Sequence, residues 1–541
     1  GDNMRMRFPE SVWMVSLALA VLTSLPYAIG WLNTPEDMTY SGAPALPDGL
    51  QWDYNSRMGT LGQGARHAWD LHLLFTPEPH DGIYLVHGFY VAAGAVGGAL
   101  GLGIPLAFHA LRFAMTIVMT LALWAFSGRF FSRTGDRWLC LSMATLASGW
   151  SWLLLVAAPD MTRAVSPIEF WLIDAYNLIG AFFAPHFAAS VALQIAGLMV
   201  FEDWIERGGA WRLGGLALVL AAVSITQPYS IALLGMLIGL LALYHMCVTR
   251  RLDWRRALGL TLPGGVYAGL VLYQYLNMTA DPVWSSFIEQ NQTRSPAAVY
   301  YVLGYAPFLL PIAAGWRSAI PMRKDARWLV PWLWVVIVAA LLYAPVMTQR
   351  RYLLGVQTPL AVLATQGWVR GVLPCLQQTR RPLASIVYVS LASSATLLMI
   401  AANASAIPST QYRDDLYYTV DERAGFAWLR DHTPPDSVVL TVATRDLHGS
   451  SGRVVAQTRR RVFAGHFIET VQFDRKVGML RRFYDPATSD AWRRSLLAEY
   501  NVEYVWYDRY ARELGAWNPA AAPYLVSVFA SDTVIVFRRE E

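Results

Sequence analysis

Long blocks of apolar residues separated by short polar loops dominate this chain. Twelve apolar stretches approach the length of a membrane-spanning helix, from residues 11–32 to residues 383–404. A helix needs about 20 consecutive apolar residues to cross the hydrocarbon core of a bilayer. The pattern therefore predicts a mainly α, polytopic membrane protein. The first stretch is too long for a signal-peptide core, so we expect it to remain as a membrane anchor.

One of the twelve stretches, residues 84–104, is a poor candidate for crossing the membrane. It contains His87 and several glycines and runs almost directly into the next stretch, 105–127. We interpret it as an interfacial or re-entrant helix on the outer face. About 11 transmembrane helices then remain.

The distribution of basic residues agrees with eleven spans. With that number, 17 Arg and Lys residues fall in inferred cytosolic loops and six fall in inferred outer loops. Basic residues are enriched on the cytosolic side of membrane proteins. The bias predicts a cytosolic N-terminus and an extracytoplasmic C-terminus. The chain thus divides into a transmembrane domain, 1–405, with a first outer loop at 33–104, and an extracytoplasmic α/β domain, 406–541.

The C-terminal segment shows mixed helical and strand periodicity. The spacing predicts an amphipathic helix over 420–432, a strand from 437, a further segment RRVFAGH from 460 and two helices between 473 and 500. Two apolar, β-branched segments, VEYVWYD and TVIVFRR, predict the closing strands.

The composition agrees with a membrane protein and argues against several other classes of protein. The 541 residues are 55% hydrophobic and 15% charged, and the mean hydropathy is +0.33. All but two of the 43 basic residues are arginine, and their placement reflects topology, so no nucleic-acid partner is expected. Three widely separated cysteines exclude a zinc module or a disulfide scaffold.

Two acids on the inferred outer face are candidate catalytic residues. Asp53 lies between Trp52 and Tyr54 in the first outer loop, and a carboxylate partly desolvated by aromatic rings suits a general base or a ligand for a metal or hydroxyl. Asp160 lies where the third span ends, with Glu169 nine residues further on. A loop cap for Asp53 and a solvated helix end for Asp160 are the structural alternatives.

Basic residues near the outer face are candidate binding residues. Arg350 and Arg351 stand side by side against the charge bias, as expected of a clamp for a lipid-linked phosphate. Arg112 lies two turns into a span and must face a cavity, a partner or the interface. His186 follows a helix-starting proline, and His466 follows the run Arg459 to Arg461. A lipid-surface anchor and a plain basic patch are the alternatives for the two arginine clusters.

The layout resembles the GT-C superfamily of polyprenyl-phosphate-dependent membrane glycosyltransferases, closest to bacterial mannosyltransferase-like and aminoarabinose-transferase-like proteins. The resemblance covers essentially the whole chain. It rests on the order of loops and on the short strings WDYNSRMG, APDM, PHF, QPYS, APVMTQRRYLLG, WLRDHTPPDSVVL and RRVFAGH.

The resemblance implies a function and roles for the candidate residues. Asp53 is similar to the first-loop acid that contacts or deprotonates the acceptor, and Asp160 to the second-loop acid of the same site. Arg350 and Arg351 resemble residues that hold the lipid-linked phosphate, while His186 and His466 resemble pocket residues. The donor would be a polyprenyl-phosphate-linked sugar at the bacterial cytoplasmic membrane. No cofactor is certain, and a divalent cation stays open.

Two other functions fit the same layout. A non-catalytic GT-C-like subunit or scaffold of a larger membrane complex would use the aromatic residues and small residues of the spans for helix packing with partner subunits. A secondary transporter would need twelve true spans with both ends in the cytosol, which the eleven-span interpretation disfavours.

Overall fold

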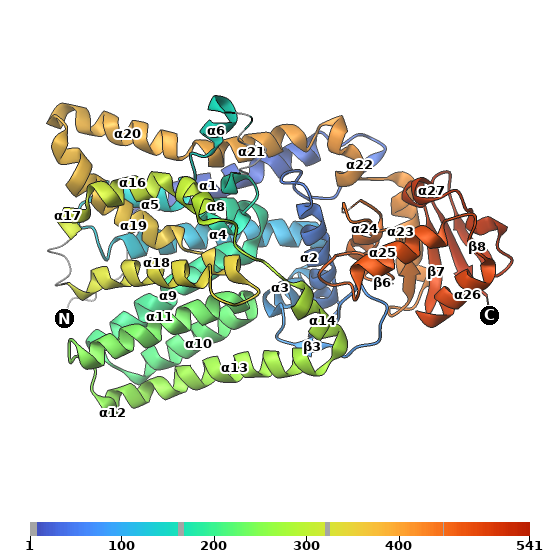
Figure 1. The fold of residues 1–541 in the computed structure, drawn as a ribbon, viewed down its shortest axis with the longest axis horizontal. Helices are drawn as coiled ribbons and strands as arrows, with labels where there is room; N and C mark the ends of the chain where they lie inside the picture. The colour runs from blue at the N-terminus through green and yellow to red at the C-terminus, as the bar shows by residue number, and fades with distance from the viewer. Residues whose placement is uncertain (1–7, 159, 161–166, 320–324, 447, 541) are drawn as a thin grey trace. The chain divides into compact units, whose positions relative to one another are not determined.

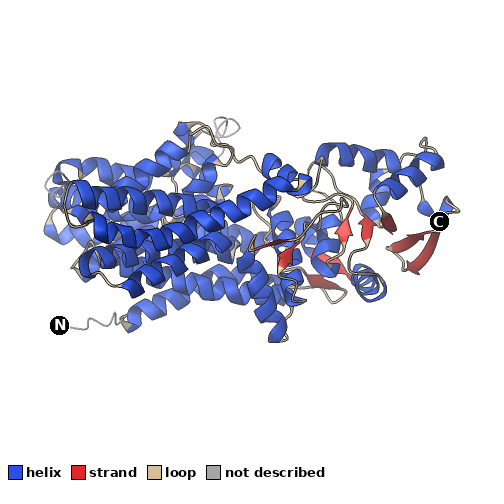
Figure 2. Ribbon diagram, turned by 90° about the horizontal axis from the view of Figure 1, so that it is seen from below, coloured by secondary structure: helices blue, strands red, loops and turns tan. Residues whose placement is uncertain are grey.

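The chain folds into two compact units in the computed structural model, which describes residues 8–158, 160, 167–319, 325–446 and 448–540. The helical unit comprises Gly1–Leu25, His109–Tyr273 and Thr293–Ala402, and the mixed unit comprises Pro26–Phe108, Gln274–Gln292 and Asn403–Glu541. Five of the basic residues counted for the predicted topology lie outside the described residues: Arg5, Arg7, Arg163, Arg323 and Lys324. All strands among the described residues belong to the mixed unit (Figure 2).

Helices account for most of the described residues (Figure 1). Within the described residues, four are long and apolar enough to cross a membrane: α1 (Glu10–Leu32), α4 (Ile104–Ser127), α9 (Pro185–Arg207) and α11 (Pro228–Cys247). The consecutive helices α20 (Arg381–Ala392) and α21 (Ser394–Ala406), bent by 46°, would make a fifth span together. These helices support a membrane protein, while the total of eleven spans and their orientation stay predictions.

Shorter helices and turns complete the helical regions of the chain. They are α5 (Thr134–Thr145), α6 (Trp152–Ala157), α8 (Asn177–Phe183), α10 (Ala210–Thr226), α12 (Trp254–Ala257), α13 (Thr261–Ala280), α15 (Ala298–Gly304), α16 (Ala306–Ala314), α17 (Trp316–Ala319), α18 (Leu329–Leu341), α19 (Gln357–Gly367), and the 3-10 turns η1 (Ile168–Phe170), η2 (Ile173–Ala175) and η6 (Gln349–Leu353). Helices α9, α10 and α11 pack against one another (Figure 1).

The span expected at 137–158 is not one continuous helix. The structure has α5 and α6 with a non-helical segment between them. Gly149 lies in that segment, and a Cβ there would come within 2.6 Å of a carboxylate oxygen of Glu169. The helix is interrupted here because the residues between α5 and α6 surround the buried carboxyl group of Glu169. Hydropathy alone does not reveal such an interruption.

Glycines bring helices close together in both units. In the helical unit, a Cβ at Gly367 of α19 would lie 2.0 Å from the carbonyl oxygen of Pro311 in α16. In the mixed unit, α2 (Leu50–Ala65) and α3 (Gly88–Ala99) make the same kind of contact. Small residues allow helix backbones to approach closely where larger side chains would clash. The 12 residues of α3 span roughly 18 Å, so this helix does not cross a bilayer by itself.

A five-stranded sheet forms the centre of the mixed unit. Its strand order is β6-β5-β7-β9-β8, with β5 (Val438–Leu440) parallel to both β6 (Arg461–Val462) and β7 (Val502–Tyr507). The remaining strands, β8 (Leu525–Ala530) and β9 (Ile535–Arg539), pair antiparallel, as do β7 and β9. Parallel pairing requires crossover connections, and the helices α24 (Ser451–Thr458), α25 (Phe473–Phe483) and α26 (Asp490–Glu499) lie in these connections.

The predicted elements of the C-terminal segment are confirmed. Helix α23 spans Val420–His432 and begins at a capping box, in which the Thr419 hydroxyl accepts from the Glu422 N–H and the Glu422 side chain accepts from the Thr419 N–H. The two predicted helices and the closing strands are also present. Helix α24, strand β8 and the short helix α27 (Arg509–Leu514) were not predicted.

Residues of the 33–104 segment, predicted to be an outer loop, pack with the C-terminal segment in the mixed unit. Strand β1 (Met38–Tyr40) pairs antiparallel with β4 (Tyr417–Thr419), and β2 (Asp70–Leu71) pairs with β3 (Ile83–Tyr84). Helix α2 packs against α24 (Figure 1). This packing places loop residues near 53 and C-terminal residues near 466 in one core.

Candidate functional site

Asp53 lies in the first turn of α2, with its side chain 57% exposed. An acid in the first turn of a helix interacts favourably with the partial positive charge of the N-terminus. Both flanking rings, Trp52 and Tyr54, are buried, and the Tyr54 hydroxyl donates to the carbonyl of Ser41 at 2.9 Å. The buried neighbours hold the helix in place, while more than half of the carboxylate side chain remains exposed.

His466 contacts this carboxylate from a different part of the chain. Its Nε2 lies 3.1 Å from Oδ1 of Asp53, and only 5% of the imidazole side chain is exposed. The loop around it is tightly held, because the Gly465 N–H donates to Thr470 Oγ1, which in turn donates to the carbonyl of Phe75. A Cβ at Gly465 would lie 2.1 Å from the Phe75 ring, so this approach requires glycine.

The charges around His466 favour its protonated form. Burial lowers the pKa of His466, but the hydrogen bond with Asp53 and the negative charges of Glu469 and Asp53 outweigh burial and raise the pKa above its usual value. Nδ1 of His466 lies 4.0 Å from Oε1 of Glu469. The imidazole is thus held between two carboxylates, one exposed and one mostly buried.

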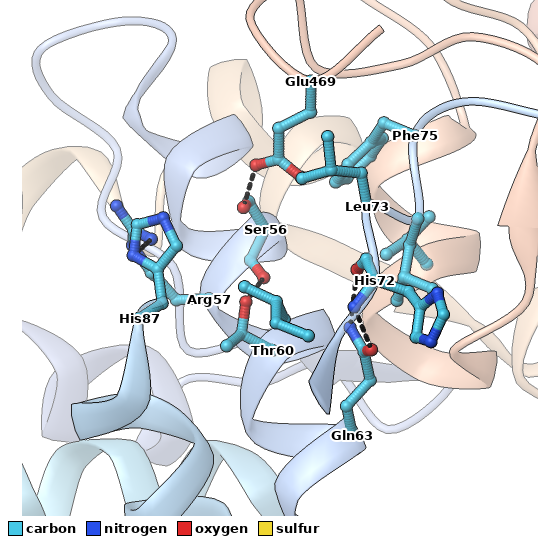
Figure 3. Close-up of a pocket in the computed structure, with 12 residues that line it drawn as sticks. Ser56, Arg57, Thr60, Gln63, His72, Leu73, Phe75, His87 and Glu469 are labelled. Carbon is cyan, nitrogen blue, oxygen red and sulfur yellow. Dashed lines mark hydrogen bonds between the residues drawn. The ribbon is translucent and has the colours of Figure 1, made fainter. Parts of the chain in front are cut away.

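Two further polar residues, Ser56 and Arg57, lie on the same helix about one turn after Asp53. Figure 3 shows Ser56 donating to Glu469, and Arg57 beside His87, with Nη1 of Arg57 3.0 Å from Nδ1 of His87. These residues line a small cavity of about 10 Å³, enough for roughly one water molecule. Residues four apart lie on the same helix face, so Arg57 places a positive charge on the face that carries Asp53.

A wide surface groove begins next to this pair. The Phe467 ring is stacked on the His466 ring, with centroids 5.2 Å apart, and is 43% exposed. Phe467 lines a groove of about 880 Å³, together with Glu289, Gln290, Gln292, Arg445, Gln472, Phe473, Asp474 and Arg475. The groove offers one exposed aromatic face and several amide and charged side chains, a mixture suited to an amphiphilic or polyhydroxylated molecule.

Glu169 of the helical unit is buried and occupied by structural hydrogen bonds. The Ser151 hydroxyl and the Trp152 N–H donate to its carboxylate at the start of α6. Burial raises the pKa of Glu169, and these hydrogen bonds oppose the shift. Its side chain is 1% exposed, so its contacts are those of a buried structural acid; a substrate-binding role stays a prediction.

Arg350 and Arg351 lie in the turn η6 of the helical unit. The Arg350 guanidinium lies 5.3 Å from the centroid of the Trp171 ring. Arg351 Nη1 lies 3.7 Å from Oδ2 of the buried Asp174. Neighbouring aromatic and acidic groups therefore hold both side chains, and 27% of the Arg351 side chain remains exposed. Binding of a lipid-linked phosphate here stays a prediction.

The other predicted residues of the helical unit have different surroundings. Arg112 is buried and donates to the Thr23 carbonyl at 2.9 Å and to Ser24 Oγ at 3.0 Å, both in α1. It thus has polar partners on a neighbouring helix, the arrangement expected for an arginine inside a span. His186 is buried at the start of α9, and Asp160 is exposed.

The structure brings together two residues that were predicted separately, whereas Asp160, the predicted catalytic partner of Asp53, belongs to the helical unit. Asp53 and His466 meet in the mixed unit, and Arg350 and Arg351 occupy one turn of the helical unit. Sequence reasoning missed Arg57, Ser56 and Glu469. The signal for Arg57 was its spacing of four from Asp53 in WDYNSRMG, which places both on one face of a helix. Nothing in the sequence indicated Glu469.

The described residues around this site do not provide a complete set of metal ligands. In the described part of the chain, no group of three or more His, Cys, Asp or Glu side chains converges as a metal site. His72 and His80 have ring centroids 5.5 Å apart, and Asp70 lies 3.3 Å from His72 Nε2.

No protein-family model and no curated protein sequence matches this chain. Its fold is similar to that of several solved structures. The oligosaccharyltransferase of Archaeoglobus fulgidus, in its apo form, gives a TM-score of 0.54 at 12% identity over 100% of this chain and 75% of that one.

Two further structures show the same likeness. ArnT from Cupriavidus metallidurans, bound to undecaprenyl phosphate, gives a TM-score of 0.51 at 12% identity, with 96% of this chain and 97% of that chain covered. Arabinofuranosyltransferase AftD from Mycobacteria gives 0.50 at 12% identity, with 96% and 41% covered. At such low identity the likeness establishes the fold, and chemistry must be argued from the site.

Proposed function

We propose that this chain, which has the GT-C fold, is a membrane glycosyltransferase that moves a sugar from a polyprenyl-phosphate donor to an acceptor on the extracytoplasmic face. The hydrogen bond between exposed Asp53 and buried His466 carries the proposal. The fold supports the reaction class, since similar structures include a transferase bound to undecaprenyl phosphate and an arabinofuranosyltransferase. The donor sugar and the acceptor are left unassigned.

Asp53 acts as the general base in this proposal. The acceptor hydroxyl oxygen attacks the anomeric carbon of the donor, the bond from that carbon to the phosphate oxygen breaks, and the phosphate leaves with the electron pair. The hydroxyl proton passes to the Asp53 carboxylate. A positioned base of this kind contributes roughly 10²–10⁴-fold to a rate.

His466 is a positioning residue for that base. Its imidazole holds one carboxylate oxygen at 3.1 Å, which fixes the orientation of the Asp53 side chain. Ser56 in turn donates to Glu469, which lies 4.0 Å from the other imidazole nitrogen. Buried side chains thus restrict the motion of an exposed carboxylate, which lowers the entropic cost of reaching the reactive geometry.

Positive charge for the departing phosphate is assigned to arginines. Arg57 shares the helix face of Asp53, and its guanidinium contacts the His87 ring nitrogen Nδ1 and the Tyr90 ring. Guanidinium groups suit bidentate recognition of phosphate oxygens. We assign Arg350 and Arg351 the same chemistry toward the lipid-linked phosphate, supported by their exposure at one turn.

A transfer assay with the purified full chain and a panel of polyprenyl-phosphate sugars tests the proposal. Asp53→Asn should lower the transfer rate by roughly 10²–10⁴-fold, while the purified protein still melts in one cooperative transition. Asp81→Asn, which changes another exposed acid of the same outer loop, should leave the rate unchanged. Full activity in Asp53→Asn would remove the assigned base. If the wild-type chain transfers no sugar and purifies with stoichiometric partner subunits, the scaffold alternative gains support.

A further inference from the structure

Four arginines gather at one place in the mixed unit, away from the Asp53 pair. Arg66 follows α2, Arg430 lies in the last turn of α23, and Arg459 and Arg460 follow α24. Arg460 Nη2 donates to the Arg430 carbonyl at 2.8 Å, and burial together with the positive charges of Arg66 and Arg430 lowers the pKa of both Arg459 and Arg460. Burial, followed by the charges of Arg66 and Arg430, lowers the pKa of Arg459 to about 10.

Helix ends explain part of this cluster. Three helices end here, and the carbonyl groups at a helix C-terminus attract cations. Arg460 supplies this positive charge at the ends of α23 and α24. It donates to the carbonyls of Arg430, Thr433 and Thr458 and to the Thr433 hydroxyl. Arg430 is paired with Asp431 at 2.9 Å. These two arginines are therefore accounted for by the fold.

Arg459 and Arg66 are not accounted for in this way. Arg459 makes one long hydrogen bond, to the Gln457 carbonyl at 3.3 Å, and its Nε is buried without a hydrogen-bond partner. Neither residue has a carboxylate within 4.0 Å in the part of the chain that the structure describes. A buried guanidinium donor without a partner, such as Arg459 Nε, costs free energy, which an added anion would recover, and the exposed guanidinium of Arg66 can reach the same anion.

The backbone is specifically arranged to hold Arg459 in this position. Arg459 has a left-handed φ of 57°, which is uncommon for a residue other than glycine. Its side-chain stem crosses α2 at Gly62, where a Cβ would lie 2.3 Å from the Arg459 Cδ. Arg66 lies one helical turn after Gly62. The missing side chain at Gly62 thus directs one guanidinium toward the other.

Apolar residues next to the cluster are exposed. Trp69 follows Arg66 by three residues and is 51% exposed. The C-terminal end of α3 lies beside the C-terminal end of α2, since a Cβ at Gly98 would lie 2.9 Å from the Ala65 carbonyl oxygen. Val96 and Leu100 at that end of α3 are largely exposed. Aromatic and aliphatic side chains beside arginines are typical of surfaces at the level of lipid head groups.

We propose that Arg66 and Arg459, backed by Arg430, form a binding site for the phosphate group of an anionic membrane lipid. The guanidiniums bind the phosphate oxygens, and Trp69 with the end of α3 contacts the adjoining apolar part of the lipid. The site is separate from the proposed catalytic residues and does not depend on glycosyl transfer. It fixes the mixed unit to the membrane surface through charge as well as apolar contact.

Native mass spectrometry of the full chain in an uncharged detergent tests the site. The protein is titrated with phosphatidylglycerol, phosphatidylcholine or inorganic phosphate. Arg66→Gln should weaken phosphatidylglycerol binding by about tenfold, the loss expected for one phosphate-bound guanidinium, and Arg459→Gln should do the same. Arg423→Gln, which removes one exposed charge from α23 outside the cluster, is the matched control and should bind as the wild type does.

The outcomes separate the sources of the phosphate. Selective loss of phosphatidylglycerol binding in both cluster variants, with phosphatidylcholine binding unchanged, supports the lipid site. Equal binding of inorganic phosphate with the same arginine dependence would keep the phosphate site and overturn its assignment to a lipid. Wild-type phosphatidylglycerol binding in Arg66→Gln, an exposed position where the change leaves the core intact, would overturn the proposal.

Discussion

His466 Nε2 lies 3.1 Å from Asp53 Oδ1, although the two residues are separated by 413 positions in the sequence. The contact joins a helix of the first outer loop to a loop beside the C-terminal sheet within one compact unit. A buried imidazole that holds an exposed carboxylate is an arrangement for orientation, because the buried partner has few alternative positions. The relationship makes His466 testable separately from Asp53.

We expect His466 to give the protein a specific pH dependence of stability. The pKa of His466 is raised in the folded protein above the ordinary 6.5. The folded state therefore binds this proton more tightly than the unfolded chain does. Its contribution to the free energy of unfolding is fully present below pH 6.5 and is lost as the pH rises through the folded pKa.

Melting temperatures of wild-type protein and His466→Gln across pH 5.5–8.5 measure this effect. The difference between the two should be largest at the acid end and shrink toward the alkaline end. His432→Gln, which changes an exposed histidine of the same unit, is the control and should follow the wild-type curve. A constant difference across the range would show that His466 stabilises the fold by packing alone.

Local patterns in the sequence predicted the helices and strands of the C-terminal segment well. The helix over 420–432 was found because its amphipathic spacing and its capping residues, Thr419 and Glu422, are local signals. Helix α24 was missed because eight residues with a glycine at the second position carry too little periodicity. Strand β6 is only two residues long, shorter than the apolar segment suggested.

Two residues of the candidate site, Asp53 and His466, were singled out from the sequence, but their contact was not predicted. Asp53 stood out because aromatic rings flank it, and His466 because it follows the run Arg459 to Arg461. Their pairing depends on tertiary packing over hundreds of residues, which a single sequence does not encode locally. Arg112 was recognised as costly within a span, but its partners in α1, Thr23 and Ser24, are common polar residues without a distinguishing pattern.

A buried ion pair links the first outer loop to α25. Lys476 Nζ lies 2.6 Å from Glu78 Oε1 and 3.2 Å from Thr76 Oγ1. Burial, opposed by Glu78, lowers the pKa of Lys476 to about 8. Removal of one partner from a buried pair leaves an uncompensated charge and typically costs about 3–5 kcal/mol. We expect roughly 3 kcal/mol for Lys476→Met, since Glu78 keeps 25% of its side-chain exposure.

A double-mutant cycle in chemical denaturation measures this pair. Lys476→Met combined with Glu78→Gln should recover at least half of the stability lost in Lys476→Met, because the second change removes the unpaired charge. The same cycle should show a pH effect: wild-type stability rises relative to Lys476→Met between pH 8 and 10.5, where the unfolded chain binds the lysine proton and the folded protein does not. Additive losses would indicate that the two side chains act independently.

The contact between α2 and α3 depends on glycine at particular positions. A Cβ at Gly94 would lie 2.0 Å from the Leu61 carbonyl oxygen, and a Cβ at Gly64 would lie 2.0 Å from the Val91 carbonyl oxygen. Both obstacles are backbone atoms, which a rotamer change cannot move. An alanine at either position must therefore push the two helices apart, whereas a helix propensity scale alone would favour the substitution.

We expect Gly94→Ala to lower the free energy of unfolding by about 2 kcal/mol or more, measured by chemical denaturation of the purified chain. Helix α2 carries Asp53, so a shift of this helix should also lower the rate of sugar transfer. Gly103→Ala is the matched control, because a Cβ there meets no atom within 4 Å. If Gly94→Ala proves as stable and as active as Gly103→Ala, the two helices are free to separate, and Asp53 does not depend on α3 for its position.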